Sequence, residues 1–519
     1  MSRLLALLPA VSALAVCGSP VVVAAESAPV AMTASGAVHG TDQDGVRRFQ
    51  GIPYAAPPVG GRRWRLPQPV SPWAGLRDAT QPGPVCMQPA APDMPRGIPQ
   101  SEDCLTLNVT SPARPRAGRP VMVWIPGGGF ITGAGSIYDP ARLVEESDTV
   151  VVTVNYRLGV FGFFAHPELG DSSNFGLQDQ LAALRWVHDN IADFGGDPGR
   201  VTLAGESAGA MSACTLMTSP AAGGLFQQAV VQSGSCLMSH PAGAFGEDVG
   251  AISTWQPLST IQGTGAAMAD RLSCADVACL RGKPASELLS ETTSFPLIAY
   301  GTSLVPGEPA EVFTAGREAA VPLLQGNTHD EHVEFTLNAY PDGITAEQYS
   351  TLLRTAFGHA APHVERQYPV REFPSPAAAA SRVFSDRDWI CASWKSGRYH
   401  AREAPTYAYV FTDPTAPTIS GLLLPDNVRP ATAHGGELAY LFDFPAGPRL
   451  TDDQRRLADQ LVGYWARFVR NGDPNGAGNQ PWPRLDVANR ALRLAPGTTR
   501  TINVATTHHC QLWNTPGPQ

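Results

Sequence analysis

The sequence contains few charged residues and has no basic excess. Asp, Glu, Lys and Arg together make up 16% of its 519 residues, and the formal net charge is −9. Because nucleic-acid binding depends on a positively charged surface, this composition argues against a nucleic-acid partner. Hydrophobic residues make up 43%, which is enough to form a large core. The composition therefore indicates a soluble globular protein.

Long apolar runs are absent after the N-terminus. The one such run, Leu4–Val23, is interrupted by Gly18–Pro20 and is followed by small residues that suit cleavage. This pattern predicts a signal peptide over residues 1–25 and a mature domain over residues 26–519. A membrane anchor is the competing interpretation, but the interrupted run is short for a bilayer span. We expect a secreted protein, extracellular or periplasmic, with no stable membrane insertion after cleavage.

Cysteine patterns typical of zinc sites are also absent. No C-x-x-C pair occurs, and His508, His509 and Cys510 are consecutive, so they cannot easily converge on one ion. Cys17 lies in the expected signal peptide, and lipoprotein anchoring through it is a minor alternative to secretion. In a secreted protein the other cysteines can form disulfides. They are Cys86, Cys104, Cys214, Cys236, Cys274, Cys279, Cys391 and Cys510.

Short apolar segments with β-strand character alternate with segments of helical periodicity. Continuous apolar strands separated by helices indicate a parallel sheet that is covered on both faces. A late helix begins with a possible capping box at Thr451 and Gln454 and ends at Asn471 and Gly472. The expected strands are Pro120–Ile125, Thr149–Tyr156, Arg200–Ala204, Gln228–Ser233, Val321–Gly326 and Thr406–Phe411, and the expected helices are Leu177–Phe194 and Ala208–Met217.

One serine stands between two glycines where an expected strand meets an expected helix. The segment G-E-S-A-G spans Gly205–Gly209, and its glycines leave room for a sharp turn that exposes the hydroxyl of Ser207. This strand–turn–helix setting is that of the nucleophile in α/β-hydrolases. A plain turn is the competing interpretation, since G-x-S-x-G alone is a weak signal.

A serine nucleophile needs a base, and the base needs an acid that orients it. In this fold the acid and then the histidine follow the serine along the chain. The segment G-N-T-H-D-E-H places Asp330 or Glu331 just after an expected strand, and A-H-G-G-E-L places His434 in a glycine-flanked loop. Later histidines in less informative contexts are His359, His363, His400, His508 and His509.

A glycine run follows the expected strand that ends at Ile125. The segment W-I-P-G-G-G-F spans Trp124–Phe130. Without a Cβ, such residues let backbone N–H groups approach a developing oxyanion, and each such donor is typically worth about 10²–10³ in rate. A flexible loop is the competing interpretation.

The chain resembles the type-B carboxylesterases, the family of the cholinesterases and the bacterial para-nitrobenzyl esterases. The resemblance implies an α/β-hydrolase fold, with a central, mostly parallel sheet, helices on both faces, and long loop and helical insertions. The matching segments cover most of the chain in the order of the family. Besides Phe194–Gly209 they are Phe49–Gly60, Ser101–Val109, Asn155–Phe163, Asn174–Gln180, His434–Phe442 and Asn471–Asn475.

Roles for individual residues follow from this resemblance. It implies Ser207 as nucleophile, Glu331 as acid and His434 as base. The resemblance further implies an oxyanion hole from the N–H groups of Gly128, Gly129 and Ala208, with Glu206 and Ser233 near the histidine–acid pair. It also implies the disulfides Cys86–Cys104, Cys274–Cys279 and Cys391–Cys510, which leaves Cys214 and Cys236 as buried thiols.

The resemblance also has departures. Pro126 stands where the family often has His or Tyr, and His332 follows Glu331 where the family usually has Gly. We expect His332 to change the shape of the loop and the pH dependence of activity.

The resulting hypothesis is hydrolysis of small carboxylic esters through an acyl-enzyme, with no metal or organic cofactor. One alternative is a family member without catalytic activity that acts as an extracellular binding or adhesion protein. Another is the same triad acting on thioesters, amides or carbamates. The natural substrate and the oligomeric state stay open.

Overall fold

The computed structural model describes residues 28–91, 94, 97–418, 423–444 and 449–514. The expected signal peptide and Cys17 lie outside these described residues. Within the described ranges, no helix combines the length and the hydrophobicity that crossing a bilayer would require.

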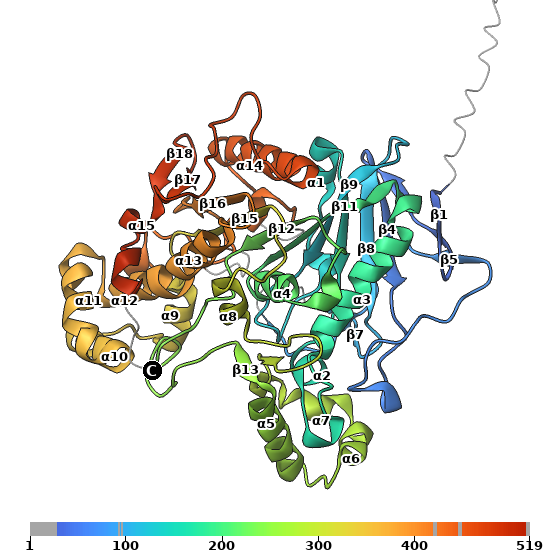
Figure 1. Cartoon of the computed structure of the whole chain (residues 1–519), viewed down its shortest axis with the longest axis horizontal. Coiled ribbons are helices and arrows are strands. Elements are labelled where there is room, and N and C mark those ends of the chain that lie inside the picture. Colours follow the sequence, from blue (N-terminus) through green and yellow to red (C-terminus); the bar gives the residue numbers. More distant parts are fainter. Residues whose placement is uncertain (1–27, 92–93, 95–96, 419–422, 445–448, 515–519) are drawn as a thin grey trace, which may run out of the picture.

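An 11-stranded sheet runs through the centre of the molecule (Figure 1). Its strand order is β18-β17-β16-β15-β12-β11-β9-β10-β8-β4-β3, and neighbouring strands from β10 to β17 are parallel. Antiparallel strands complete both edges. This confirms the predicted mostly parallel sheet. The strands are β3 (Thr41–Gln43), β4 (Val46–Pro53), β8 (Thr106–Pro112), β9 (Arg119–Ile125), β10 (Val150–Val154), β11 (Gly196–Glu206), β12 (Gln228–Gln232), β15 (Leu323–Thr328), β16 (Thr406–Phe411), β17 (Arg490–Leu494) and β18 (Arg500–Asn503).

Smaller sheets of two or three strands lie outside this sheet. They involve β1 (Val30–Thr33), β2 (Gly36–His39), β5 (Leu76–Asp78), β6 (Val85–Cys86), β7 (Gln100–Ser101), β13 (Trp255–Pro257) and β14 (Ile298–Tyr300). Two of these strands, β6 and β7, pair in parallel beside the disulfide that joins Cys86 to Cys104.

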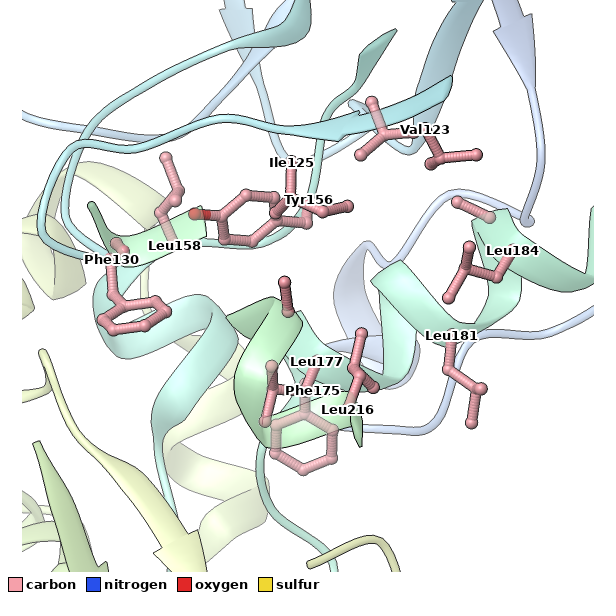
Figure 2. Packing of buried hydrophobic residues seen from close by; sticks show 14 of the residues in the cluster. Val123, Ile125, Phe130, Tyr156, Leu158, Phe175, Leu177, Leu181, Leu184 and Leu216 are labelled. Atoms are coloured by element: carbon pink, nitrogen blue, oxygen red, sulfur yellow. The ribbon is translucent and has the colours of Figure 1, made fainter. Parts of the chain in front are cut away.

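Helices cover both faces of the sheet, which explains why β9, β10, β15 and β16 are buried at every position. In β9, Val123 and Ile125 pack on one face with Leu184 of α3, whereas Met122 and Trp124 pack on the opposite face with residues of α1 and α14. Figure 2 shows the first of these clusters. Each fully buried side chain of this size contributes about 1.5–3 kcal/mol.

Two groups of helices extend away from the sheet (Figure 1). Helices α5, α6 and α7 make up one group, and α10, α11 and α12 make up the other, which has its own apolar cluster. These are the expected helical insertions. The helices are α1 (Ala141–Ser147), α2 (Gly159–Phe163), α3 (Phe175–Asn190), α4 (Ala208–Met217), α5 (Leu258–Arg271), α6 (Val277–Gly282), α7 (Ala285–Leu289), α8 (Pro309–Thr314), α9 (Val333–Ala339), α10 (Ala346–Phe357), α11 (Ala361–Gln367), α12 (Pro376–Phe384), α13 (Cys391–His400), α14 (Asp452–Asn471) and α15 (Val504–Thr507).

Several expected boundaries differ by a few residues from the structure. Helix α3 begins at Phe175, and the end of the expected helix tightens into a 3₁₀ turn over Ile191–Phe194. Helix α14 has the predicted capping box, in which the Thr451 hydroxyl accepts from Gln454 N–H and the Gln454 amide accepts from Thr451 N–H.

The described part of the chain contains four disulfides. Three join Cys86 to Cys104, Cys274 to Cys279, and Cys391 to Cys510. The fourth joins Cys214 of α4 to Cys236, so the interpretation of these two residues as buried thiols was wrong. Their Cα atoms lie 5.8 Å apart because the segment after β12 returns over α4, and this separation is one that a disulfide spans.

Candidate active site

Ser207 occupies the tip of the turn between β11 and α4. Its backbone has φ 56° and ψ −122°, a conformation that is strained for a residue with a side chain. Close backbone approach explains the flanking glycines. A Cβ on Gly209 would lie 1.9 Å from the carbonyl oxygen of Ile125, and one on Gly205 would lie 2.4 Å from the carbonyl carbon of Gly209. The N–H of Ser207 donates to the carbonyl of Gln232, which ties the turn to β12.

Glu331 lies just after β15 and is fully buried. Its Oε1 accepts hydrogen bonds from Asn327 Nδ2 at 3.0 Å and from the N–H of Thr328 at 2.9 Å. These two donors fix the carboxylate so that Oε2 lies 2.6 Å from Nδ1 of His434. The structure therefore brings Glu331 to the histidine.

Asp330, the other candidate acid, points elsewhere. Its Oδ2 accepts from the N–H of Thr432, and its Oδ1 accepts from Arg382 Nη1 at 3.2 Å. The N–H of Asp330 also donates to the carbonyl of Thr432, two residues before His434. Asp330 thus joins the loop of the acid to the loop of the histidine.

His434 lies between the acid and the serine turn. Its Nε2 is 3.2 Å from Oε1 of Glu206, the residue directly before Ser207. This nitrogen makes no hydrogen bond to another described residue. The rings of Trp389 and Phe335 pack against the imidazole, with centroids 4.7 and 5.5 Å away. One nitrogen is therefore held by Glu331, and the other is oriented toward the segment that carries Ser207.

The other candidate histidines are placed differently. His400 Nδ1 lies 2.8 Å from Glu318, and His508 Nδ1 lies 2.7 Å from Asp386, and both imidazoles are buried. Exposed or partly exposed positions are occupied by His359, His363 and His509.

Carboxylates dominate the electrostatics around His434. Burial alone would lower its pKa, but the charges of Glu206 and Glu331 outweigh burial and raise the pKa to about 9. A third carboxylate, Glu437, accepts from Gln232 Nε2 and from the hydroxyl of Tyr409, each at 3.1 Å. Sequence reasoning missed Glu437, although its position three residues after His434 was a possible signal.

The glycine run lies against the serine turn. A Cβ on Gly127 would lie 3.1 Å from Cβ of Ser207. The N–H groups of Gly128 and Gly129 donate to no other described residue, and Ala208 opens α4, where N–H groups lack an intrahelical acceptor. The hydroxyl of Tyr156 donates to the Pro126 carbonyl at 3.0 Å. Backbone donors are thus available close to Ser207.

Ser233 lies at the end of β12 and is fully buried. Its N–H donates to the carbonyl of Gly326, and its Oγ makes no hydrogen bond to another described residue. The expected role of Ser233 beside the histidine–acid pair therefore stays a prediction.

One group of potential metal ligands occurs among the described residues. It comprises His240, His332 and Asp388. Both ring nitrogens of His332 already have partners, because Nε2 lies 2.9 Å from the carbonyl of Ala244 and Nδ1 accepts from Trp389 Nε1. Burial lowers the pKa of His332 to about 4, so this residue is neutral near pH 7. The group is thus poorly suited to bind a cation, and a His332 that is neutral near pH 7 does not support the expected effect of this residue on the pH dependence there.

The sheet, the serine turn and the histidine between two carboxylates are those of an α/β-hydrolase. The chain matches the model of the carboxylesterase family over residues 27–513 and belongs to that family. It is a carboxylic-ester hydrolase, which favours catalysis over the adhesion role considered above.

Individual relatives agree with this membership. The chain is 35% identical to a cocaine esterase of Oryctolagus cuniculus, over 88% of this chain and 89% of the relative. It is 34% identical to a fumonisin B1 esterase of Sphingopyxis macrogoltabida, over 92% and 89%. Among solved structures, a thermophilic pNB esterase superimposes with a TM-score of 0.79 at 30% identity, covering 94% of this chain and 100% of that one.

Proposed function

We propose that the ester hydrolysis of this family is carried out here by Ser207, His434 and Glu331. The observation that carries the proposal is the position of His434. Its Nδ1 is fixed by Glu331 at 2.6 Å, and its Nε2 faces the turn that exposes Ser207. A nucleophile, a base and an orienting acid in this order define acyl transfer by a serine enzyme.

In the first half of the reaction, Ser207 Oγ attacks the carbonyl carbon of the ester while Nε2 of His434 takes the hydroxyl proton. The imidazolium then gives that proton to the leaving alcohol, which leaves an acyl group on Ser207. In the second half, water loses a proton to the same nitrogen and attacks the acyl group, which releases the carboxylic acid. The buried Glu331 keeps Nδ1 protonated and stabilises the imidazolium in both halves.

The oxyanion formed in each half needs donors that are already in place. The proposed donors are the N–H groups of Gly128, Gly129 and Ala208, supported by the contact of the glycine run with the turn. Preorganised donors of this kind stabilise the transition state more than the substrate, since the charge develops only on the oxyanion.

The glutamates next to the triad adjust its charge. Glu206 lies against Nε2, and Glu437 lies three residues after His434. Both favour the imidazolium, so they strengthen His434 as a base toward the serine hydroxyl but reduce the fraction of it that is neutral near pH 7. This predicts activity that increases toward alkaline pH.

The substrate is a small carboxylic ester. The four disulfides between described residues support a secreted enzyme, because disulfides form and persist in oxidising compartments. Residues 26–519 would then form one hydrolase domain after removal of residues 1–25.

The test is Ser207→Ala in the purified mature protein. Hydrolysis of a p-nitrophenyl ester should fall by at least about 10⁴-fold, since the residual rate depends on binding and the oxyanion hole alone. An organophosphate should label the wild type at Ser207 and leave the variant unlabelled. Unchanged circular dichroism would show that the fold persists. Retention of most of the activity would reject the assignment.

A further inference from the structure

Two arginines at the edge of the main sheet lie opposite each other without an acidic partner. Arg493 of β17 and Arg500 of β18 are cross-strand neighbours. Among the described residues, neither forms an ion pair, and Arg493 Nη1 donates only to the hydroxyl of Thr498. Burial and then the charge of Arg500 lower the pKa of Arg493. Like charges in directly opposed strand positions destabilise a sheet, so this arrangement needs an explanation.

Both arginines line one cavity of about 310 Å³. The rest of its lining includes the hydroxyls of Thr412 and Thr507, which can donate to an anion, and the rings of His329 and His508, whose Nδ1 atoms already face Asp330 and Asp386. The cavity lining contains no carboxylate, although the protein as a whole carries a net charge of −9.

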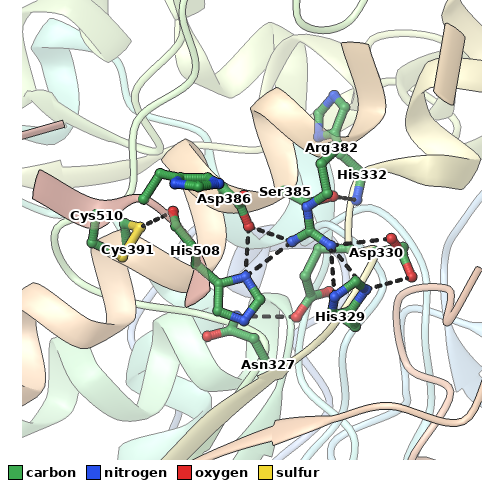
Figure 3. Close-up of polar contacts among 12 residues, drawn as sticks. Asn327, His329, Asp330, His332, Arg382, Ser385, Asp386, Cys391, His508 and Cys510 are labelled. Atoms are coloured by element: carbon green, nitrogen blue, oxygen red, sulfur yellow. Dashed lines mark hydrogen bonds and ion pairs between the residues drawn. A yellow bond between two sulfur atoms is a disulfide. The ribbon is translucent and has the colours of Figure 1, made fainter. Parts of the chain in front are cut away.

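The two histidines of the cavity also belong to a buried polar network, which Figure 3 shows. Arg382 forms ion pairs with Asp386 and with Asp330, and His508 Nδ1 lies 2.7 Å from Asp386. Nδ1 of His329 lies 2.8 Å from Nη1 of Arg382. Nε2 of His508 is buried and has no hydrogen-bond partner among the described residues. The inner wall of the cavity is therefore held rigidly, and one of its polar groups lacks a partner.

We infer that this cavity is a binding site for a phosphate group, held between the guanidinium groups of Arg493 and Arg500. Two guanidinium groups match the two negative charges of a phosphate dianion, and each can donate two parallel hydrogen bonds to its oxygens. The hydroxyls of Thr412 and Thr507 supply further donors. The cavity lining includes His329, two residues before Glu331, but none of Ser207, Glu331 and His434, so the site does not depend on the proposed catalytic roles.

Calorimetric titration of the mature protein with inorganic phosphate tests this inference, with ionic strength held constant by sodium chloride. The wild type should show saturable binding to one site. Arg500→Gln and Arg493→Gln should each weaken binding by about tenfold or more, because each removes a charged bidentate donor. The matched control is Arg490→Gln, on the same strand as Arg493 but paired with Asp486, and it should bind phosphate as the wild type does.

A second arm identifies the source of the phosphate group. Phenyl phosphate that binds more tightly than inorganic phosphate would indicate a monoester ligand, and the reverse order would indicate the free ion. Either order supports the site. Lack of saturable phosphate binding by the wild type would overturn the inference. So would undiminished binding by a folded Arg493→Gln/Arg500→Gln double variant, because the phosphate would then bind elsewhere.

Discussion

Two imidazoles in this molecule make the same contact and differ in charge. His434 Nδ1 lies 2.6 Å from Glu331, and His508 Nδ1 lies 2.7 Å from Asp386. Their side chains are 12% and 2% exposed. Nevertheless, the pKa of His434 is raised to about 9, whereas that of His508 is lowered to about 4.

The neighbours of each pair explain the difference. Burial lowers the pKa of both histidines, but around His434 the additional carboxylates Glu206 and Glu437 reverse this effect. Beside His508, the charge of Arg382 adds to the effect of burial. A histidine–carboxylate pair is therefore insufficient to define a base. The surrounding charges and the access of Nε2 to a nucleophile decide whether the pair is catalytic.

Matched asparagine variants should separate the two pairs most clearly. Asparagine can donate to the carboxylate through Nδ2 but has no counterpart of Nε2. His434→Asn should lower kcat by at least about 10⁴-fold, since the general base is lost. His508→Asn should lower kcat by less than about tenfold, since most changes remote from the reacting atoms act on stability. Steady-state hydrolysis of p-nitrophenyl acetate measures both rates. Equal losses in two folded variants would contradict the distinction.

Replacing Arg382 should destabilise the buried network that contains the pair of His508 and Asp386. In Arg382→Gln, Asp330 and Asp386 lose their shared cation while they stay largely buried. Uncompensated buried charge typically costs about 3–5 kcal/mol in the free energy of unfolding, which urea denaturation at pH 7 measures. The control is Arg371→Gln, whose pair with Glu372 is exposed, and it should change the free energy by less than about 0.5 kcal/mol. Similar costs for the two variants would contradict a buried network.

The catalytic pair could be predicted from the sequence, and the second pair could not. Ser207 has a local signature because its turn requires glycines on both sides. Glu331 and His434 follow expected strands, and the chain order of the fold places them after the serine. The resemblance then selects Glu331 over Asp330, which the structure shows to have a different set of partners.

The second pair has no local signal in the sequence, because His508 and Asp386 are far apart in the chain and neither lies in a recognisable motif. His508 and Asp386 are separated by 122 residues, and their contact depends on how the helical turn Ser385–Ile390, which follows α12, packs against the end of α15. The pairing of Cys214 with Cys236 has the same origin, since it depends on the path of the chain after β12. Contacts of this kind are set by tertiary packing, which the sequence pattern does not display.

The low pKa of His508 predicts sensitivity to acid. The folded protein keeps this imidazole neutral down to about pH 4, whereas an unfolded chain takes up the proton near pH 6.5. The unfolded state therefore binds more protons between these values, so stability falls as the pH decreases. Between pH 7 and pH 5 this one group should remove about 2 kcal/mol from the free energy of unfolding. His508→Asn should lose less than the wild type over the same interval. Equal losses would show that His508 titrates normally.

Replacing one carboxylate near His434 tests whether these carboxylates set the charge of the histidine. The neutral imidazole is the base, so a raised pKa confines activity to higher pH, and kcat/KM should increase along a limb above pH 6.5. Glu206→Gln keeps the shape of the side chain and removes a negative charge 3.2 Å from Nε2, which destabilises the imidazolium. The pKa of His434 should fall, and the limb should move to lower pH by about one unit, equivalent to about 1.4 kcal/mol. Glu334→Gln, a change in the partly exposed first turn of α9, is the control and should leave the limb in place. A limb that stayed unchanged in Glu206→Gln would show that Glu331 and Glu437 alone set the charge of the base.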